Sequence, residues 1–266
     1  MKEATANIGN AGTVLLKLEH VSKVYGGKEA LTNVLNDISI AIEPREFVAI
    51  MGPSGSGKST LLNCISSIDT VTSGAITLAG RDITRMRGAE LAKFRRNELG
   101  FIFQDSNLLD TLTGFENIAL ALTLKGAPAR EIEPRVKAMA RTLGVEDVLK
   151  KFPQQMSGGQ RQRVAAARAM ISKPQLVLAD EPTGALDFRS SIVLLESLER
   201  MNQQMGATIM MVTHDAFAAS YSTRTIFIRD GRLFNEVRRG NTTRPEYYQR
   251  VVEVVSFLGG ELNDAR

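Results

Sequence analysis

The sequence that decides the fold reads FVAIM at residues 47–51, followed by GPSGSGKST at residues 52–60. A short apolar run that ends in a glycine-rich loop and opens a helix is the pattern of a phosphate-binding loop. Its glycines let backbone N–H groups turn around an anion, and the helix N-terminus adds its positive end. We expect Lys58 to reach the terminal phosphates and the Ser59 hydroxyl to bind Mg²⁺. The predicted nucleotide contacts are Gly52, Pro53, Ser54, Gly55, Ser56, Gly57, Lys58, Ser59 and Thr60.

Two further apolar runs also end at polar residues. LVLA at residues 176–179 precedes Asp180 and Glu181, and IMMV at residues 209–212 precedes Thr213 and His214. Continuous apolar runs are typical of strands covered on both faces, as in a largely parallel sheet, where ligands bind at the carboxyl ends of the strands. The sequence therefore predicts an α/β fold that brings the glycine loop, the acidic pair and the histidine to one edge.

The acidic pair has a clear chemical use beside a phosphate loop. Asp180, at the end of its strand, is placed to hold Mg²⁺ through water, and Glu181 can reach the water that attacks the terminal phosphate. A buried strand that ends in two carboxylates loses solvation energy unless cations are near. The pattern therefore favours a catalytic magnesium site.

Helix-forming composition fills much of the chain between the first two of these strands. It covers residues 116–124, 130–142 and 160–171, with predicted breaks at Gly126, Pro128, Pro134 and Pro153. We expect residues 105–171 to form a helical subdomain inserted into a core of residues 14–104 and 172–240. Early strands at 14–18, 38–42 and 75–78 predict a small antiparallel layer.

The two ends of the chain give weaker signals. Residues 1–13 contain no hydrophobic stretch typical of a secretory signal, and we interpret them as a flexible lead-in. Residues 241–266 predict a helical tail that starts near Pro245. Its apolar stripe either packs onto the core or serves self-association. The stripe contains Tyr247, Tyr248, Val251, Val254, Val255 and Leu258.

Composition excludes several classes of protein. The 266 residues include 43% hydrophobic and 23% charged residues, which is typical of a folded globular chain. The longest apolar run has five residues, whereas a membrane span needs about 20. The single cysteine, Cys64, excludes an internal disulfide and suits the cytosol. The net charge is +4, and the basic stretch 81–96 lacks interleaved aromatics, so we favour a solvated helix face over a nucleic-acid patch.

A third motif, SGGQ at residues 157–160, could alone be a capped helix after a loop. However, the motif lies after the phosphate loop and before Asp180-Glu181, and in this order it resembles the signature motif of ATP-binding-cassette (ABC) ATPases. Met156 stands where leucine is usual in that family, an apolar replacement of similar volume. The resemblance implies the family's phosphate-loop ATPase core with an inserted helical subdomain, and ATP with Mg²⁺ as ligands.

The resemblance also implies roles for residues that the spacing alone does not assign. Gln104 matches the Q-loop glutamine that contacts Mg²⁺ and the attacking water, and Asp187 belongs to the D-loop at residues 184–187. His214 matches the switch histidine that contacts the γ-phosphate. Tyr25 resembles the aromatic residue that stacks on adenine, although a core tyrosine is the alternative.

One phosphate loop and one signature motif occur in the chain. The resemblance therefore implies a head-to-tail dimer of two copies, with each ATP between the loop of one subunit and Ser157, Gly158, Gly159 and Gln160 of the other. Lys58, Mg²⁺ and the partner's helix N-terminus would then stabilise the phosphoryl charge, while Glu181 and His214 orient water.

Longer segments resemble one group of ABC transporter ATPases, which includes macrolide exporters and lipoprotein-releasing ATPases, and most of all the bacitracin-resistance (Bce) type. This resemblance implies a separate, large permease with an extracellular domain, a sensor histidine kinase reached through it, and a place on the inner face of the cell membrane. The permease is expected to dock near Gln104 and residues 107–115. Macrolide export, lipoprotein release, non-transport regulation of cell-wall enzymes and a nucleic-acid-stimulated ATPase are the alternatives. The segments include residues 66–69, 101–113, 218–221 and 247–260.

Overall fold

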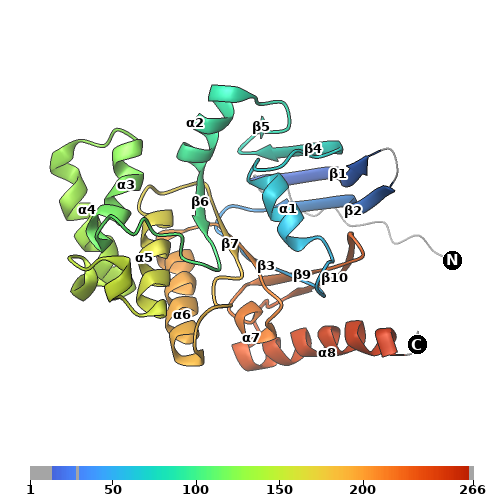
Figure 1. Ribbon diagram of the computed structural model, residues 1–266. Helices are drawn as coiled ribbons and strands as arrows, with labels where there is room; N and C mark the ends of the chain where they lie inside the picture. Colours follow the sequence, from blue (N-terminus) through green and yellow to red (C-terminus); the bar gives the residue numbers. More distant parts are fainter. Residues whose placement is uncertain (1–13, 28–29, 264–266) are drawn as a thin grey trace.

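The computed structural model describes residues 14–27 and 30–263, with side chains as far as residue 258, so the predicted lead-in at 1–13 lies outside the described residues. Two sheets form the centre of the molecule (Figure 1). The antiparallel sheet has the order β2-β1-β4-β5, and the larger sheet has the order β10-β9-β3-β8-β7-β6. The predicted α/β fold and its antiparallel layer are confirmed.

The strands are β1 (Leu16–Gly27), β2 (Ala30–Ile42), β3 (Phe47–Met51), β4 (Ser73–Leu78), β5 (Arg81–Asp82), β6 (Leu99–Ile102), β7 (Leu176–Asp180), β8 (Ile209–Val212), β9 (Arg224–Arg229) and β10 (Arg232–Arg238). The helices are α1 (Lys58–Ile65), α2 (Gly88–Glu98), α3 (Gly114–Leu124), α4 (Ala129–Leu143), α5 (Gly158–Met170), α6 (Phe188–Met205), α7 (Ala216–Ala219) and α8 (Arg244–Asn263). Two short 3₁₀ helices cover Glu146–Val148 and Pro153–Gln155.

The three apolar runs are adjacent parallel strands of the larger sheet. β3 pairs with β8 and β8 with β7, in a register that places Ile50 beside Val212 and Val212 beside Asp180. All residues of β3 and β8 are buried, as expected for strands covered on both faces. The residues after these strands therefore meet at one edge, as predicted.

The helices α3, α4 and α5 pack on one another to one side of the sheets (Figure 1). The prediction that Pro134 interrupts the helical segment is wrong, because α4 continues through it. Pro134 lies in the second turn, and the only intrahelical bond that it removes is the one to the carbonyl of Arg130, close to the helix start. Leu143, Val136 and Ala140 are fully or almost fully buried, and this packing offsets the loss.

The C-terminal helix α8 lies along the edge of the larger sheet and packs on α7 and β10. Tyr247, Val251 and Leu258 of its apolar stripe are buried, whereas Val255 is 36% exposed. Packing onto the core thus accounts for only part of the stripe. Among the residues that the structure describes, no helix has the length and apolarity needed to cross a membrane.

Asn117 is a buried polar residue in the first turn of α3, and its side chain holds the loop that precedes this helix. Its Oδ1 accepts from Leu109 N at 2.9 Å, and its Nδ2 lies within 3.0–3.1 Å of the carbonyls of Leu109, Leu112 and Thr113. We expect Asn117→Ala to lower the free energy of unfolding by about 2 kcal/mol, because these buried groups lose their partner. Chemical denaturation measures this, with Gln203→Ala at an exposed helical position as the control, and equal stabilities would contradict it.

Candidate active site

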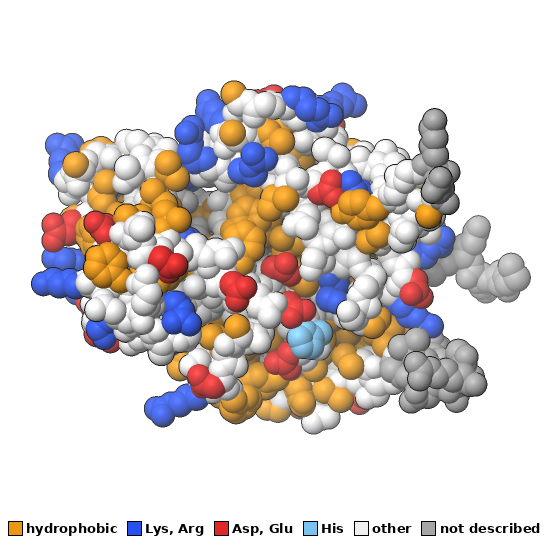
Figure 2. Space-filling model, viewed as in Figure 1, with side chains coloured by type: hydrophobic (Ala, Val, Ile, Leu, Met, Phe, Trp, Pro, Cys, Tyr) orange, Lys and Arg blue, Asp and Glu red, His pale blue; other side chains and the backbone are white. Residues whose placement is uncertain are grey.

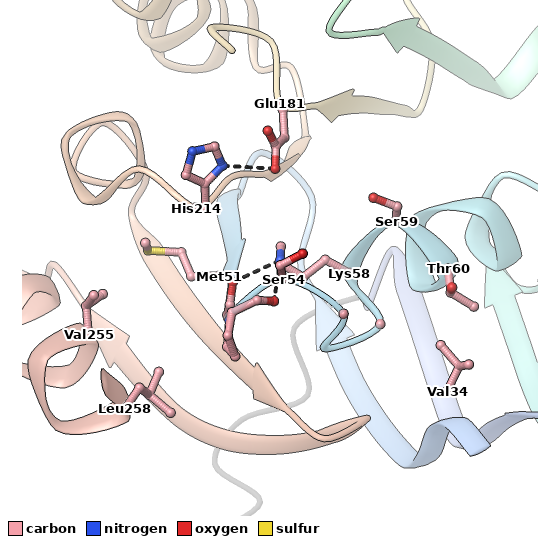
Figure 3. Close-up of a pocket in the computed structure, with 14 residues that line it drawn as sticks. Val34, Met51, Ser54, Lys58, Ser59, Thr60, Glu181, His214, Val255 and Leu258 are labelled. Carbon is pink, nitrogen blue, oxygen red and sulfur yellow. Dashed lines mark hydrogen bonds and ion pairs between the residues drawn. The ribbon is translucent and has the colours of Figure 1, made fainter. Parts of the chain in front are cut away.

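A cavity of about 830 Å³ opens at the carboxyl ends of the parallel strands (Figure 3). It is lined by Gly52–Gly55 and Gly57–Thr60, together with Glu181 and His214. Its size lies in the range of small-molecule sites. The structure thus gathers most of the predicted phosphate-loop residues, the acidic pair's second member and the histidine around one space. Four apolar lining residues were not predicted as part of a site, namely Val34, Met51, Val255 and Leu258.

The loop conformation depends on glycine at two positions. Gly52 has φ +155°, and a Cβ there would lie 2.0 Å from the carbonyl oxygen of Ile228. Gly57 has φ +98° at the N-cap of α1, and a Cβ there would lie 2.6 Å from Val34 O. Among the described residues no side chain caps α1, and the buried Ser56 Oγ has no hydrogen-bond partner. The open N-terminus of α1 thus offers N–H donors to an anion.

Lys58 is held inside the loop. Its Nζ donates to the carbonyl oxygens of Gly52 and Pro53, each at 2.9 Å, and the residue is 8% exposed. Burial lowers the pKa of Lys58, and the charges of Glu181 and Asp180 counteract this shift. Both of these bonds go to neutral carbonyls, which leaves the charge of Lys58 available for a phosphate that enters the cavity.

Two oxygen atoms beside the loop are suited to act as ligands of a magnesium ion. Ser59 Oγ and Asp180 Oδ1 are 3.5 Å apart. Burial, followed by the charge of Glu181, raises the pKa of Asp180, so a nearby cation would stabilise its charged form. Mg²⁺ usually takes one or two protein oxygens and completes its shell with water and phosphate. The donor set therefore fits Mg²⁺ bound together with a nucleotide.

Glu181 and His214 lie across the cavity from the helix α1 (Figure 3). His214 Nδ1 is 3.0 Å from Glu181 Oε1. Glu181 has φ +43°, an uncommon conformation for a residue with a side chain, and its N–H donates to Val212 O at 2.9 Å. Such strain occurs often at functional sites, where the surrounding structure maintains it. The pair is thus fixed in position by β7 and β8.

Other predicted site residues do not line this cavity. Gln104 packs on the D-loop, since a Cβ placed on Gly184 would lie 3.1 Å from the Nε2 atom of Gln104. Ser157 and Gln160 form a capping box at the start of α5, with Ser157 N donating to Gln160 Oε1 at 2.9 Å. Asp187 caps α6 by accepting from Ser190 N at 2.9 Å. A single copy therefore holds the signature motif apart from its own phosphate loop.

Tyr25 is 41% exposed, so the alternative of a core tyrosine is wrong. Its hydroxyl donates to Asp69, and Lys23 Nζ lies 4.6 Å from its ring centroid. The hydrogen bond to Asp69 raises the pKa of Tyr25, with burial as a smaller cause. Tyr25 lies at the end of β1 and not among the residues that line the cavity.

Sequence reasoning missed Gln162, which joins α5 to two loops near the site. It is 2% exposed, and its Nε2 donates to Phe103 O at 2.5 Å and to Pro182 O at 3.0 Å. These carbonyls directly precede Gln104 and follow Glu181. A glutamine inside a helix carries no sequence signal for such a role, because the role depends on how α5 packs on the sheet.

Comparison with known proteins gives one family. The model of the family "ABC transporter" matches residues 35–184. The chain is 46% identical over 250 residues to the bacitracin export ATP-binding protein BceA of Halalkalibacterium halodurans, covering 94% of this chain and 99% of that protein. It is 49% identical to the ABC transporter ATP-binding protein YxdL of Bacillus subtilis, covering 94% and 96%.

More distant relatives include longer proteins. The macrolide export ATP-binding/permease protein MacB of Brucella melitensis is 40% identical, and the match spans 39% of its length. Among solved structures, a dimeric post-hydrolysis state of the ATP-binding cassette MJ0796 with ADP and Pi has a TM-score of 0.77 at 37% identity, covering 84% of this chain and 98% of that one. A second dimeric structure of that cassette has a TM-score of 0.78.

Proposed function

This chain belongs to the ABC transporter family as an ATPase that powers a separate membrane permease, and we propose that its transporter confers resistance to antimicrobial peptides that target the cell wall, such as bacitracin. The observation that carries the proposal is the 46% identity to a bacitracin export ATP-binding protein over nearly the whole of both chains. Macrolide export is the second candidate, supported by the 40% identity to MacB.

We propose that ATP binds between two copies of the chain. The solved cassettes that resemble it are dimers, and one of them contains ADP and Pi. Ser157–Gln160 lie outside the cavity of their own chain, so only another copy can bring this motif to the phosphate loop. The N-terminus of α5 would then face the terminal phosphate, where the positive end of the helix is favourable.

We propose roles for the remaining residues from their geometry together with the family resemblance. Lys58 would bind the terminal phosphates, Ser59 and Asp180 would hold Mg²⁺, and the family resemblance adds Gln104 to this set. When bound, Mg²⁺ neutralises charge that develops on the phosphates. Glu181 orients the attacking water and accepts its proton, because its carboxylate faces the cavity. His214, 3.0 Å from Glu181, fixes this carboxylate and contacts the γ-phosphate.

The division of the chain and its partners complete the proposal. We propose an ATPase domain at 14–240 with a helical subdomain at 105–171, followed by a helical tail at 241–266. Binding to the permease would place the chain on the inner face of the membrane. The permease's large extracellular domain and a sensor histidine kinase bound through it belong to the same proposal, and an adjacent gene for such a permease would support it.

A groove between α2 and α3 suits the permease, and it reaches Phe103 beside Gln104 but is not lined by residues 107–115, where the resemblance also placed the contact. This cavity of about 340 Å³ is lined by Arg95, Phe101, Phe103 and Leu124, among others. The rings of Phe101 and Phe103 stack with centroids 5.3 Å apart, and Leu124 is 56% exposed. Figure 2 shows apolar side chains exposed below the basic side chains of α2. An apolar floor with a cationic rim is suited to a short amphipathic helix of the permease.

We expect Leu124→Asp to weaken binding to the permease about tenfold, because it places a charge in the apolar part of the groove. Co-purification with the permease measures this, and growth with bacitracin measures the resulting loss of resistance. Leu233→Asp, at an exposed apolar residue of β10, is the control. Unchanged bacitracin sensitivity with increased macrolide sensitivity would contradict the peptide-resistance proposal in favour of macrolide export.

A further inference from the structure

The helix α8 presents apolar side chains to solvent beside the active-site cavity. Val255 is 36% exposed and Phe257 is 58% exposed. Val255 and Leu258 line the same cavity as Lys58 and Glu181, on the side opposite Val34 (Figure 3). Figure 2 shows apolar side chains gathered over α7 and α8, next to the histidine of the site. The apolar patch is therefore continuous with the opening of the ATP site.

Several contacts hold α8 in this position. The buried Tyr247 hydroxyl lies 2.7 Å from Thr225 Oγ1 and donates to Val237 O at 3.1 Å. The ring of Phe257 stacks on Phe234 with centroids 6.1 Å apart. Because the helix is anchored to β9 and β10 along its length, Val255 is presented at a fixed place. A rigid, exposed apolar side chain at the entrance of a site is suited to contact with another surface.

The signature motif indicates which surface approaches. Within one chain the start of α5 packs against the start of α6, because a Cβ at Gly159 would lie 2.7 Å from Ser190 Oγ. A Cβ at Gly158 would lie 3.7 Å from the side chain of Leu186. A partner that brings its signature motif to the phosphate loop must therefore bring the start of its α6 as well. There the large apolar side chain of Phe188 is 69% exposed.

We propose that Val255 of one copy packs against Phe188 of the other when ATP closes the dimer, so that α8 is part of the ATP-site interface. The inference rests on the proposed ATP-sandwich dimer and adds a contact outside the catalytic motifs. It assigns the exposed part of the α8 stripe to self-association, while Tyr247, Val251 and Leu258 pack onto the core. A second copy is the fitting occupant because the patch continues into a cavity that one chain cannot complete.

Cross-linking between two chains that each carry one introduced cysteine tests this contact. One chain carries Phe188→Cys and the other, with a larger tag, carries Val255→Cys, both with Glu181→Gln to retain ATP. Burial raises the pKa of the only native cysteine, Cys64, to about 11, so this thiol does not compete. We expect at least about tenfold more 188–255 disulfide with ATP than without it, because closure raises the effective concentration of the two thiols.

The tags and a size measurement separate the outcomes. A 188–255 product that depends on ATP supports the contact, whereas a 255–255 product shows that α8 meets α8 and overturns it. Leu31→Cys in place of Val255→Cys is the control, because Leu31 is 75% exposed and lies outside the cavity lining. A dimer that forms with ATP but gives no 188–255 product overturns this contact alone. Absence of any ATP-dependent dimer overturns the proposed sandwich and this inference with it.

Discussion

Glu181→Gln should reduce ATP turnover by about 10²- to 10⁴-fold, which is the usual contribution of a positioned general base. Glutamine keeps the shape of glutamate but cannot accept a proton from water. ATP binding should persist, because the substitution removes a negative charge from a cavity that receives phosphates. Release of phosphate measures turnover, nucleotide titration measures binding, and size-exclusion chromatography with ATP should show a stable dimer.

Glu199→Gln is the matched control for this substitution. Glu199 pairs with Arg239 at 3.1 Å and its side chain is 20% exposed, which resembles the 3.0 Å pair and 26% exposure of Glu181. It lies on α6, outside the residues that line the cavity. We expect wild-type turnover in this variant. Hydrolysis near the wild-type rate in Glu181→Gln would remove Glu181 from the central role.

The parts of the fold predicted best are those with local sequence signals. Continuous apolar runs predicted β3, β7 and β8, because strands buried on both faces leave no polar alternation. The strands β6, β9 and β10 were missed. The apolar run of β6 is interrupted by Gly100, the apolar run of β9 covers only residues 226–228, and β10 is largely exposed, so none of the three shows a clear strand pattern. The predicted helix break at Pro134 was wrong, because the free-energy cost of a proline depends on its place in the helix and on the packing of that helix.

The active site was predictable where each residue follows its own strand. Lys58, Glu181 and His214 converge because parallel strands end at one edge. The apolar wall from α8 was not predicted as part of the site, since Val255 reaches the cavity only through the packing of a distant helix. Gln162 was missed for the same reason. Long-range packing of helices on the sheet has no signature in the local sequence pattern.

Lys58→Ala should weaken ATP binding by about 100-fold, or about 2.7 kcal/mol. The Nζ donates to two carbonyl oxygens of the loop, which keep the cation directed within the phosphate-binding turn. Alanine removes this charge, and the charges of Asp180 and Glu181 then remain in the cavity beside the phosphates. The loss of binding free energy should therefore be larger than that of one hydrogen bond. The substitution should lower the affinity for ATP more than it lowers the turnover rate. Titration with a fluorescent ATP analogue measures it.

Lys125→Ala is the matched control for Lys58→Ala. Lys125 also donates to two carbonyls, Asn97 O at 2.7 Å and Ser172 O at 3.0 Å, and burial also lowers its pKa. It lies at the end of α3, outside the residues that line the cavity. If both variants lost ATP affinity equally, the effect would come from lost folding stability and not from the phosphate contact. Loss in Lys58→Ala alone, at equal thermal stability, assigns the contact to Lys58.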